Sequence, residues 1–144
     1  AGASKTVSPL ATTTYTVTIS DNNGCTASTS VTVTVNPRPT VTASASPSTI
    51  CVDDSSVLTA VGAGGTQPYT YAWSNGLGAG ASKTVSPTAT TTYTVTITDN
   101  NGCTASTSVT VTVNPRPTVT ASASPSTICV DESSGLAAGR VGGT

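Results

Sequence analysis

An internal repeat constrains this sequence more than any other feature. Residues 1–56 recur as residues 79–134 with three changes, which replace Leu10 by Thr88, Ser20 by Thr98 and Asp54 by Glu132. The unit is 78 residues long, because Ala79 takes the place of Ala1. That period exceeds the repeats of solenoid proteins and matches a whole small β-sandwich domain. The sequence therefore predicts domains in tandem.

Strict alternation of apolar and hydroxyl residues identifies the local structure. VTVTV stands at 31–35 and 109–113, and YTVTI stands at 15–19 and 93–97. Such alternation is typical of strands that bury one face, with threonine on the exposed face. A disordered, threonine-rich stalk is the alternative for this composition, but it has no reason to alternate. The pattern favours strands.

A proline motif gives the expected boundaries between domains. Asn36-Pro37-Arg38-Pro39 recurs as Asn114-Pro115-Arg116-Pro117. Two prolines separated by one residue favour a stiff, extended connection outside any sheet ladder. We therefore expect 1–36 to be the C-terminal half of one domain, 37–114 a complete domain, and 115–144 the N-terminal part of a further domain.

Short strands between turn residues fill the complete domain. They end in a hairpin across Asp99–Gly102, and a weak strand is possible before residue 81. Seven or so short strands in such a length predict a β-sandwich. The expected strands are 40–46 with a continuation at 48–52, 56–62, 68–74, 81–86, 91–99 and 103–113.

Composition excludes several classes of function. Only 8% of residues are charged and the net charge is −1, whereas nucleic-acid binding requires a basic face. No apolar run approaches the roughly 20 residues of a membrane helix. The chain has no histidine, and no carboxylates stand at acid–base spacing to take its place. We expect a protein that is not an enzyme, binds no nucleic acid and does not span a membrane.

Oxygen-rich turns are weak candidates for calcium. Asp53, Asp54 and Asp99 lie in such turns, and carboxylates are the ligands that calcium prefers. Tight turns use the same residue types for local hydrogen bonds and positive φ. Few carboxylates converge, so the turn reading is favoured and no cofactor is expected.

Aromatic residues on the third strand have two readings. Trp73, Tyr71 and Tyr69 share one face by period two. They could form a carbohydrate-binding platform or the core of a sandwich, and the core reading is favoured. Tyr93 is expected to hydrogen-bond back to the backbone at a strand corner. The predicted core residues are Trp73, Tyr71, Tyr93, Val95, Ile97, Val109 and Val111.

The ordered motifs resemble a known repeat class. They are Ile50-Cys51 before Asp53-Asp54, the run from Tyr69 to Gly76, Thr84-Val-Ser-Pro87 before Thr90–Thr96, Asp99-Asn-Asn-Gly-Cys103 and the proline linker. This combination resembles the tandem immunoglobulin-like, PKD-like repeats of large secreted surface proteins of Bacteroidota, of the adhesin or gliding-associated type. The resemblance implies an all-β fold of immunoglobulin-like β-sandwich domains in tandem. The tail 135–144 departs from its counterpart 57–66.

Four cysteines with an extracellular composition indicate disulfides, for which three connectivities are possible. The resemblance supports a bond between Cys51 and Cys103 inside the complete domain, with Cys25 and Cys129 pairing in neighbouring domains. The alternative joins Cys25 to Cys51 and Cys103 to Cys129 across the linker, which the limit of about 7 Å between Cα atoms disfavours. Zinc is not expected, since there is no histidine and no Cys-x-x-Cys.

Together these features predict a structural, extracellular or cell-surface repeat protein. Half a sandwich exposes an apolar face, so neighbouring copies of the same protein are expected to complete 1–36 and 115–144. The result would be an extended rod or filament, such as a surface fibre, an adhesin stalk or a biofilm matrix. Exposed threonines could carry O-linked glycans. The alternative is a carbohydrate- or protein-binding adhesion module, which requires exposed aromatic residues.

Overall fold

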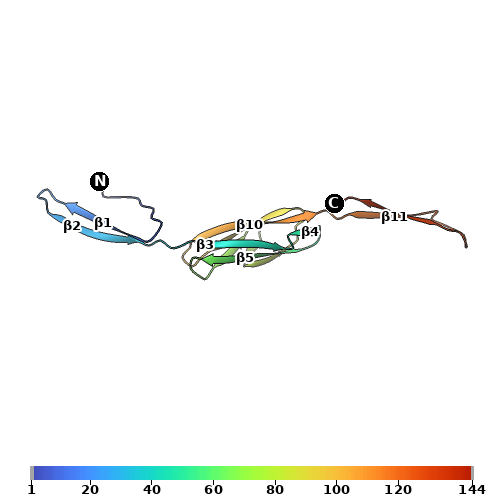
Figure 1. The fold of residues 1–144 in the computed structure, drawn as a ribbon, viewed down its shortest axis with the longest axis horizontal. Coiled ribbons are helices and arrows are strands. Elements are labelled where there is room, and N and C mark those ends of the chain that lie inside the picture. The colour runs from blue at the N-terminus through green and yellow to red at the C-terminus, as the bar shows by residue number, and fades with distance from the viewer. Residues whose placement is uncertain (1, 144) are drawn as a thin grey trace.

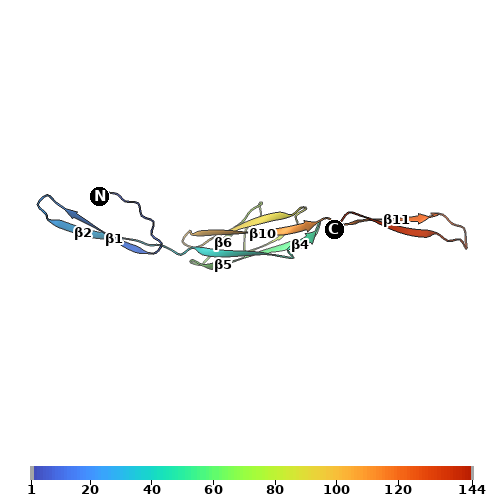
Figure 2. The ribbon, with the colours of Figure 1, turned by 45° about the horizontal axis from the view of Figure 1, so that its top comes forward.

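Three segments follow one another along the long axis of the structure, a computed structural model that describes residues 2–143 (Figures 1 and 2). A hairpin of β1 (Thr13–Ser20) and β2 (Thr26–Val33) forms the first segment. A packed body of strands β3 to β10 forms the second, and a hairpin of β11 (Thr118–Ser124) and β12 (Gly135–Val141) forms the third. Residues 2–143 contain strands and no helix.

The packed body, here named the central module, contains eight strands that follow the alternating segments of the sequence. β7 is the weak strand that the sequence left open before residue 81. The strands are β3 (Pro39–Ser46), β4 (Thr49–Cys51), β5 (Ser56–Gly64), β6 (Thr70–Trp73), β7 (Gly78–Ala79), β8 (Ser82–Val85), β9 (Thr91–Thr98) and β10 (Thr104–Asn114).

Two sheets form the central module. One has the order β3-β5-β8, and the other has the order β4-β10-β9-β6-β7. All neighbouring strands are antiparallel except β4 and β10, which run parallel. The first strand is split between the sheets, and the last strand lies between β4 and β9. This is the order of an immunoglobulin-like β-sandwich.

The core lies between the two sheets and follows the alternation of the sequence. Along β9, Tyr93, Val95 and Ile97 are buried, while the threonines between them are exposed or half-buried. Leu58 of β5 in the facing sheet and Val111 of β10 in the same sheet are also fully buried. Because successive side chains on a strand point to opposite faces, the threonines cover the outside of the sheet.

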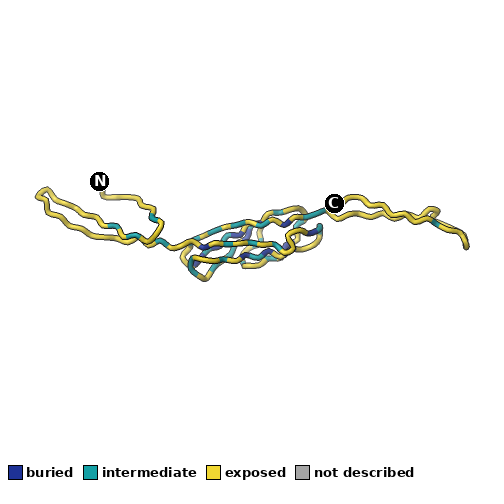
Figure 3. The backbone as a smooth tube through the Cα atoms, in the orientation of Figure 1, coloured by how far each residue is buried: buried dark blue, intermediate teal, exposed yellow. Residues whose placement is uncertain are grey.

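The same sequence is exposed in the flanking hairpins. Ile97 is 0% exposed in the central module, whereas its counterpart Ile19 in β1 is 67% exposed. Leu58 is 0% exposed, whereas its counterpart Leu136 in β12 is 85% exposed. Figure 3 shows this contrast as a dark core between two exposed hairpins. Each hairpin has one sheet layer and lacks the layer that covers it in the central module.

Proline at the module boundary corrects one sequence expectation. Pro39 was expected outside the sheet, but it is buried, opens β3 and stands opposite Gly64. A proline is compatible with the first position of a strand, where no N–H is needed for the ladder. The connection outside the sheets is therefore shorter than the proline motif, and the division at 37 and 114 stays a prediction.

Candidate functional site at the module junctions

Two of the three carboxylates considered for calcium, Asp54 and Asp99, have protein partners, and they lie in different turns. Asp54 is paired with Arg116, and Asp99 accepts hydrogen bonds from the backbone. Asp53 is exposed, with φ of 75° in the turn after β4. Within residues 2–143, no group of three or more metal-ligating side chains comes together. The chemistry at these turns is local hydrogen bonding.

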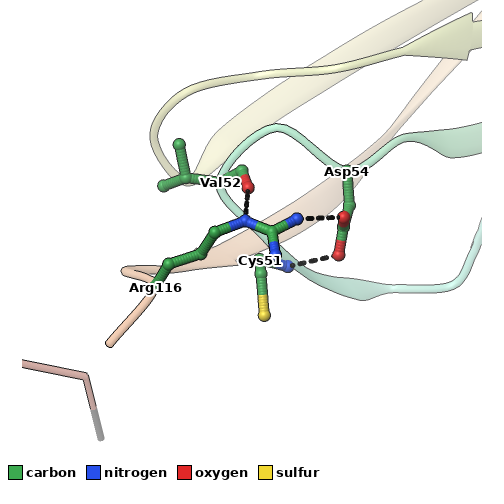
Figure 4. A network of polar contacts seen from close by, with 4 residues as sticks. All are labelled: Cys51, Val52, Asp54 and Arg116. Carbon is green, nitrogen blue, oxygen red and sulfur yellow. Dashed lines mark hydrogen bonds and ion pairs between the residues drawn. The ribbon is translucent and has the colours of Figure 1, made fainter. Parts of the chain in front are cut away.

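Arg116 of the linker contacts the C-terminal end of the central module. Its Nε donates to the backbone oxygen of Val52 at 2.6 Å, and its guanidinium forms an ion pair with Asp54 (Figure 4). Both side chains of the ion pair are about half exposed. Pairs of this kind are worth about 0–1 kcal/mol and weaken with salt. The contact sets the direction of the linker more than it stabilises the fold.

Cys51 lies at this same end of the module. In the parallel pairing of β4 and β10, Cys51 stands opposite Asn114, the last residue before the linker. Asp54 fixes its backbone, since the Cys51 N–H donates to Asp54 Oδ2 at 3.4 Å and the Asp54 N–H donates to the Cys51 oxygen at 3.1 Å. Figure 4 draws Cys51 together with Val52, Asp54 and Arg116 at this end of the module.

Asp99 organises the opposite end of the module. Its carboxylate accepts N–H groups of Thr66 at 3.0 Å and of Asn101 and Cys103 at 2.9 Å. Burial of the carboxyl group raises the pKa of Asp99, but the hydrogen bonds from Thr66, Cys103, Asn101 and Gly102 outweigh this effect and hold the pKa below its usual value. Asp99 therefore ties the β9–β10 turn to the loop after β5.

Arg38, the counterpart of Arg116, belongs to this second end. Its guanidinium donates to the backbone oxygen of Thr104 at 3.2 Å. A surface hollow here is lined by both the linker and the turn, including Asn36, Pro37, Arg38 and Cys103. Residues 8–12 of the first segment line its other side. The junction is thus a contact region between segments.

The cysteine geometry corrects the predicted disulfide. Cys51 and Cys103 are free, as are Cys25 and Cys129. Cys51 stands opposite the last residue of β10, whereas Cys103 directly precedes its first residue. At about 3.4 Å per residue, the eleven residues of β10 place the two cysteines roughly 35 Å apart. A bond between Cys51 and Cys103 within the module is therefore excluded by geometry.

The aromatic residues of β6 face inward. Trp73 is 6% exposed, and its Nε1 donates to the Gly80 oxygen at 2.8 Å. Tyr71 is partly buried and accepts the Gly62 N–H, and Tyr69 donates to the Gly64 oxygen. The two tyrosine bonds join β6 and the residue before it to β5, the Trp73 bond joins β6 to the residue after β7, and no aromatic platform remains on this strand.

The other predicted core residues lie on β9 and β10. Val95, Ile97 and Val111 are 0% exposed, Tyr93 is 5% exposed, and Val109 is partly buried against the core. The hydroxyl-to-backbone bond expected at Tyr93 is found instead at Tyr69, which donates to Gly64, and at Tyr71, which accepts from Gly62.

Three residues important at these sites were missed from the sequence. They are Arg116 and Arg38, for which the sequence predicted no contact, and Gly62 of β5, where the missing side chain leaves room for Ile97. The position of Arg38 and Arg116 inside a repeated proline motif is the signal that would have found them. Nothing in the local sequence identifies Gly62, because its role depends on Ile97 of another strand.

Comparison with known proteins adds a structural likeness. No family model and no curated protein sequence matches the chain. The structure of the amphioxus IgVJ-C2 molecule is similar over 67% of this chain, with 24% identity and a TM-score of 0.46. The chain spans 57% of that molecule. The assignment of an immunoglobulin-like sandwich rests on the strand order of the central module. Among residues 2–143, no helix has the length and apolar character needed to cross a bilayer.

Proposed function

We propose that this protein is a structural repeat protein whose copies join end to end into an extended rod or filament. The observation that carries the proposal is the contrast between identical sequences in different surroundings. Val95 and Ile97 are fully buried by the facing sheet, whereas Val17 and Ile19 are 57% and 67% exposed. An apolar face of this kind marks a surface that is covered by a partner.

A second copy of the chain is the proposed occupant of this face. In the central module, strands β9 and β10 are covered by β3 and β5 of the same module. Residues 118–124 repeat the sequence of β3, and β11 pairs with β12 in the register that β3 has with β5. The C-terminal hairpin of one copy therefore has the shape to cover the N-terminal hairpin of the next.

The linkers support a mechanical role. Each junction has a proline motif and an arginine that contacts the adjacent module, so successive modules are held in line rather than hinged freely. The outer faces carry threonine ladders, with Thr92 and Thr110 hydroxyls 2.8 Å apart. We propose an extracellular or cell-surface location, in which such hydroxyl faces keep the rod soluble and can accept O-linked glycans.

The adhesion-module alternative receives less support. It requires exposed aromatic side chains, yet Trp73 is 6% exposed and its indole N–H is satisfied within the module. The isolated carboxylates and the absence of histidine from the sequence also favour a protein without catalytic activity.

Sedimentation velocity in reducing buffer tests the proposal. We expect species that grow with protein concentration for the unaltered chain. Ile19→Lys puts a charge on the apolar face of β1, so it should leave the chain monomeric while the central module stays folded. Thr16→Lys is the matched control, since Thr16 is exposed and its counterpart Thr94 is exposed in the central module. A concentration-independent monomer for the unaltered chain would contradict the proposal.

A further inference from the structure

We propose that the cysteines form disulfides between adjacent modules rather than within one. The cysteine that ends β4 of one module pairs with the cysteine before β10 of the next. Between separate copies this predicts Cys51 with Cys25 of the following copy, and Cys129 with its Cys103. The pairing between copies rests on the proposed function, whereas the pairing between covalently joined modules does not.

The first step is the position of the cysteines at opposite ends. Cys51 stands opposite Asn114, and Asn114 is followed at once by the linker. Cys103 precedes β10 at the other end, next to the preceding linker. A module that follows another in line therefore brings its β10 cysteine to the same junction as the β4 cysteine of its predecessor.

The second step uses the repeat to locate the missing partner. Asn36 occupies the position in the first segment that Asn114 occupies in the central module. A β4 strand added to the first segment would place its cysteine opposite Asn36. Cys103 lines the same surface hollow as Asn36, Pro37 and Arg38. Both cysteines of the proposed pair thus belong to one small region.

The third step is the way in which carboxylates hold each cysteine backbone. The carboxylate of Asp54 accepts the Cys51 N–H, and the Asp54 N–H donates to the Cys51 backbone oxygen. Asp99 makes the same two hydrogen bonds with Cys103. Glu132 and Asp21 repeat these contacts in the flanking segments, at Cys129 and Cys25. A fixed backbone favours the narrow range of Cα separations, about 4.4–6.8 Å, that a disulfide requires.

The linker arginines each hold a linker against the central module close to one of the cysteines. The bond of Arg38 to the Thr104 oxygen draws the linker against the residue that follows Cys103. Arg116 draws the next linker against Val52, the residue that follows Cys51. Arg38 and Arg116 are equivalent in the repeat, so together they mark the neighbours of both proposed cysteine positions, Arg38 on the module after its linker and Arg116 on the module before its linker.

The chemistry needs an oxidant, for which we name a small disulfide such as oxidised glutathione. One cysteine thiolate attacks the small disulfide and releases one thiol as leaving group. The second cysteine thiolate attacks the mixed disulfide and releases the other thiol. Two cysteine thiols lose two electrons and two protons, and one small disulfide gains them. The product is one Sγ–Sγ bond between the modules.

Covalent tandem modules test the pairing without any need for assembly. Residues 37–114 enclose their own core, so two such units can be joined in sequence. In the test protein, Cys51 is kept in the first unit and Cys103 in the second, with serine at the other two positions. In the control, Cys51 and Cys103 are both kept in the first unit. Oxidised glutathione is added and free thiols are titrated after denaturation.

The test protein is expected to lose both free thiols with no change in molecular mass beyond two hydrogens, and the control is expected to form no bond between its own two cysteines. An internal bond in the control, or none in the test protein, overturns the inference. In the natural chain, Cys103→Ser with Cys129→Ser should give a covalent ladder on a non-reducing gel. Cys25→Ser with Cys129→Ser should give none. If the tandem test protein forms its bond but the natural chain gives no ladder, the proposed function is contradicted and the pairing between modules is not.

Discussion

Ile97 Cδ1 lies in the space that a β-carbon on residue 62 would need, so any larger residue at position 62 would force the Ile97 side chain to move. The hydroxyl of Tyr71 in β6 and the ring of Tyr69 just before β6 close the same space. Gly62 also donates its N–H to that Tyr71 hydroxyl at 3.1 Å. This one position therefore joins three strands from both sheets of the module.

Gly62→Ala is expected to destabilise the central module by about 1–3 kcal/mol, because the added methyl group overpacks a closed core. Chemical denaturation followed by Trp73 fluorescence measures the change. Ala63→Ser is the control, since Ala63 is exposed one position along the same strand. Equal stability of Gly62→Ala and the unaltered chain would refute the contact.

Arg140 stands at the position of Gly62 in the third segment, opposite Val119 as Gly62 is opposite Val41. When a second copy covers this hairpin, Ile19 takes the place of Ile97 against residue 140. Arg140→Gly should therefore remove a steric obstacle and tighten assembly about tenfold, which corresponds to about 1.4 kcal/mol. Sedimentation velocity gives the dissociation constant. Arg140→Lys retains a long side chain and should leave the dissociation constant unchanged.

Asp99 should make the module sensitive to acid. Its pKa is lowered in the folded state, so its contribution to stability is present above the unfolded pKa of about 3.9 and is lost as pH falls through the lower folded value. Asp99→Asn should lower the stability of the module at pH 7. It should also reduce the further loss of stability that occurs as the pH falls below about 4. Denaturation midpoints at several pH values measure this.

Asp21→Asn is the matched control, because Asp21 bonds to Asn23 and Cys25 in the same way but lies in the first segment. Its replacement should leave the acid profile of the central module unaltered. An identical acid profile for Asp99→Asn and the unaltered chain would show that the Asp99 hydrogen bonds do not contribute.

The fold was largely predictable from the sequence because alternation is a local signal. Val95 and Ile97 are buried, and Thr94 is exposed, because the pleat sends successive side chains to opposite faces. The separation of Cys51 from Cys103 was not predictable in this way. It depends on the direction in which β4 runs beside β10, and parallel pairing sends Cys51 to the far end of that strand.

Arg116→Gln should change the geometry of the junction more than the stability of the module. The ion pair with Asp54 is about half exposed, so we expect a loss of about 0–1 kcal/mol in denaturation. The third segment should then sample more directions, which small-angle scattering detects as a smaller maximum dimension. High salt should have part of the same effect on the unaltered chain. Arg140→Gln, outside the junction, should leave the dimension unchanged.

Electron microscopy of the unaltered chain in reducing buffer tests most directly the claim that neighbouring copies complete the flanking hairpins. The eleven residues of β10 and a short extended linker give a module spacing of about 45 Å. Since each copy contributes its central module and one shared module, the account predicts unbranched filaments one module wide, with an axial repeat of about 90 Å per copy. Isolated particles, each with a single packed body and uncovered hairpins, would contradict it.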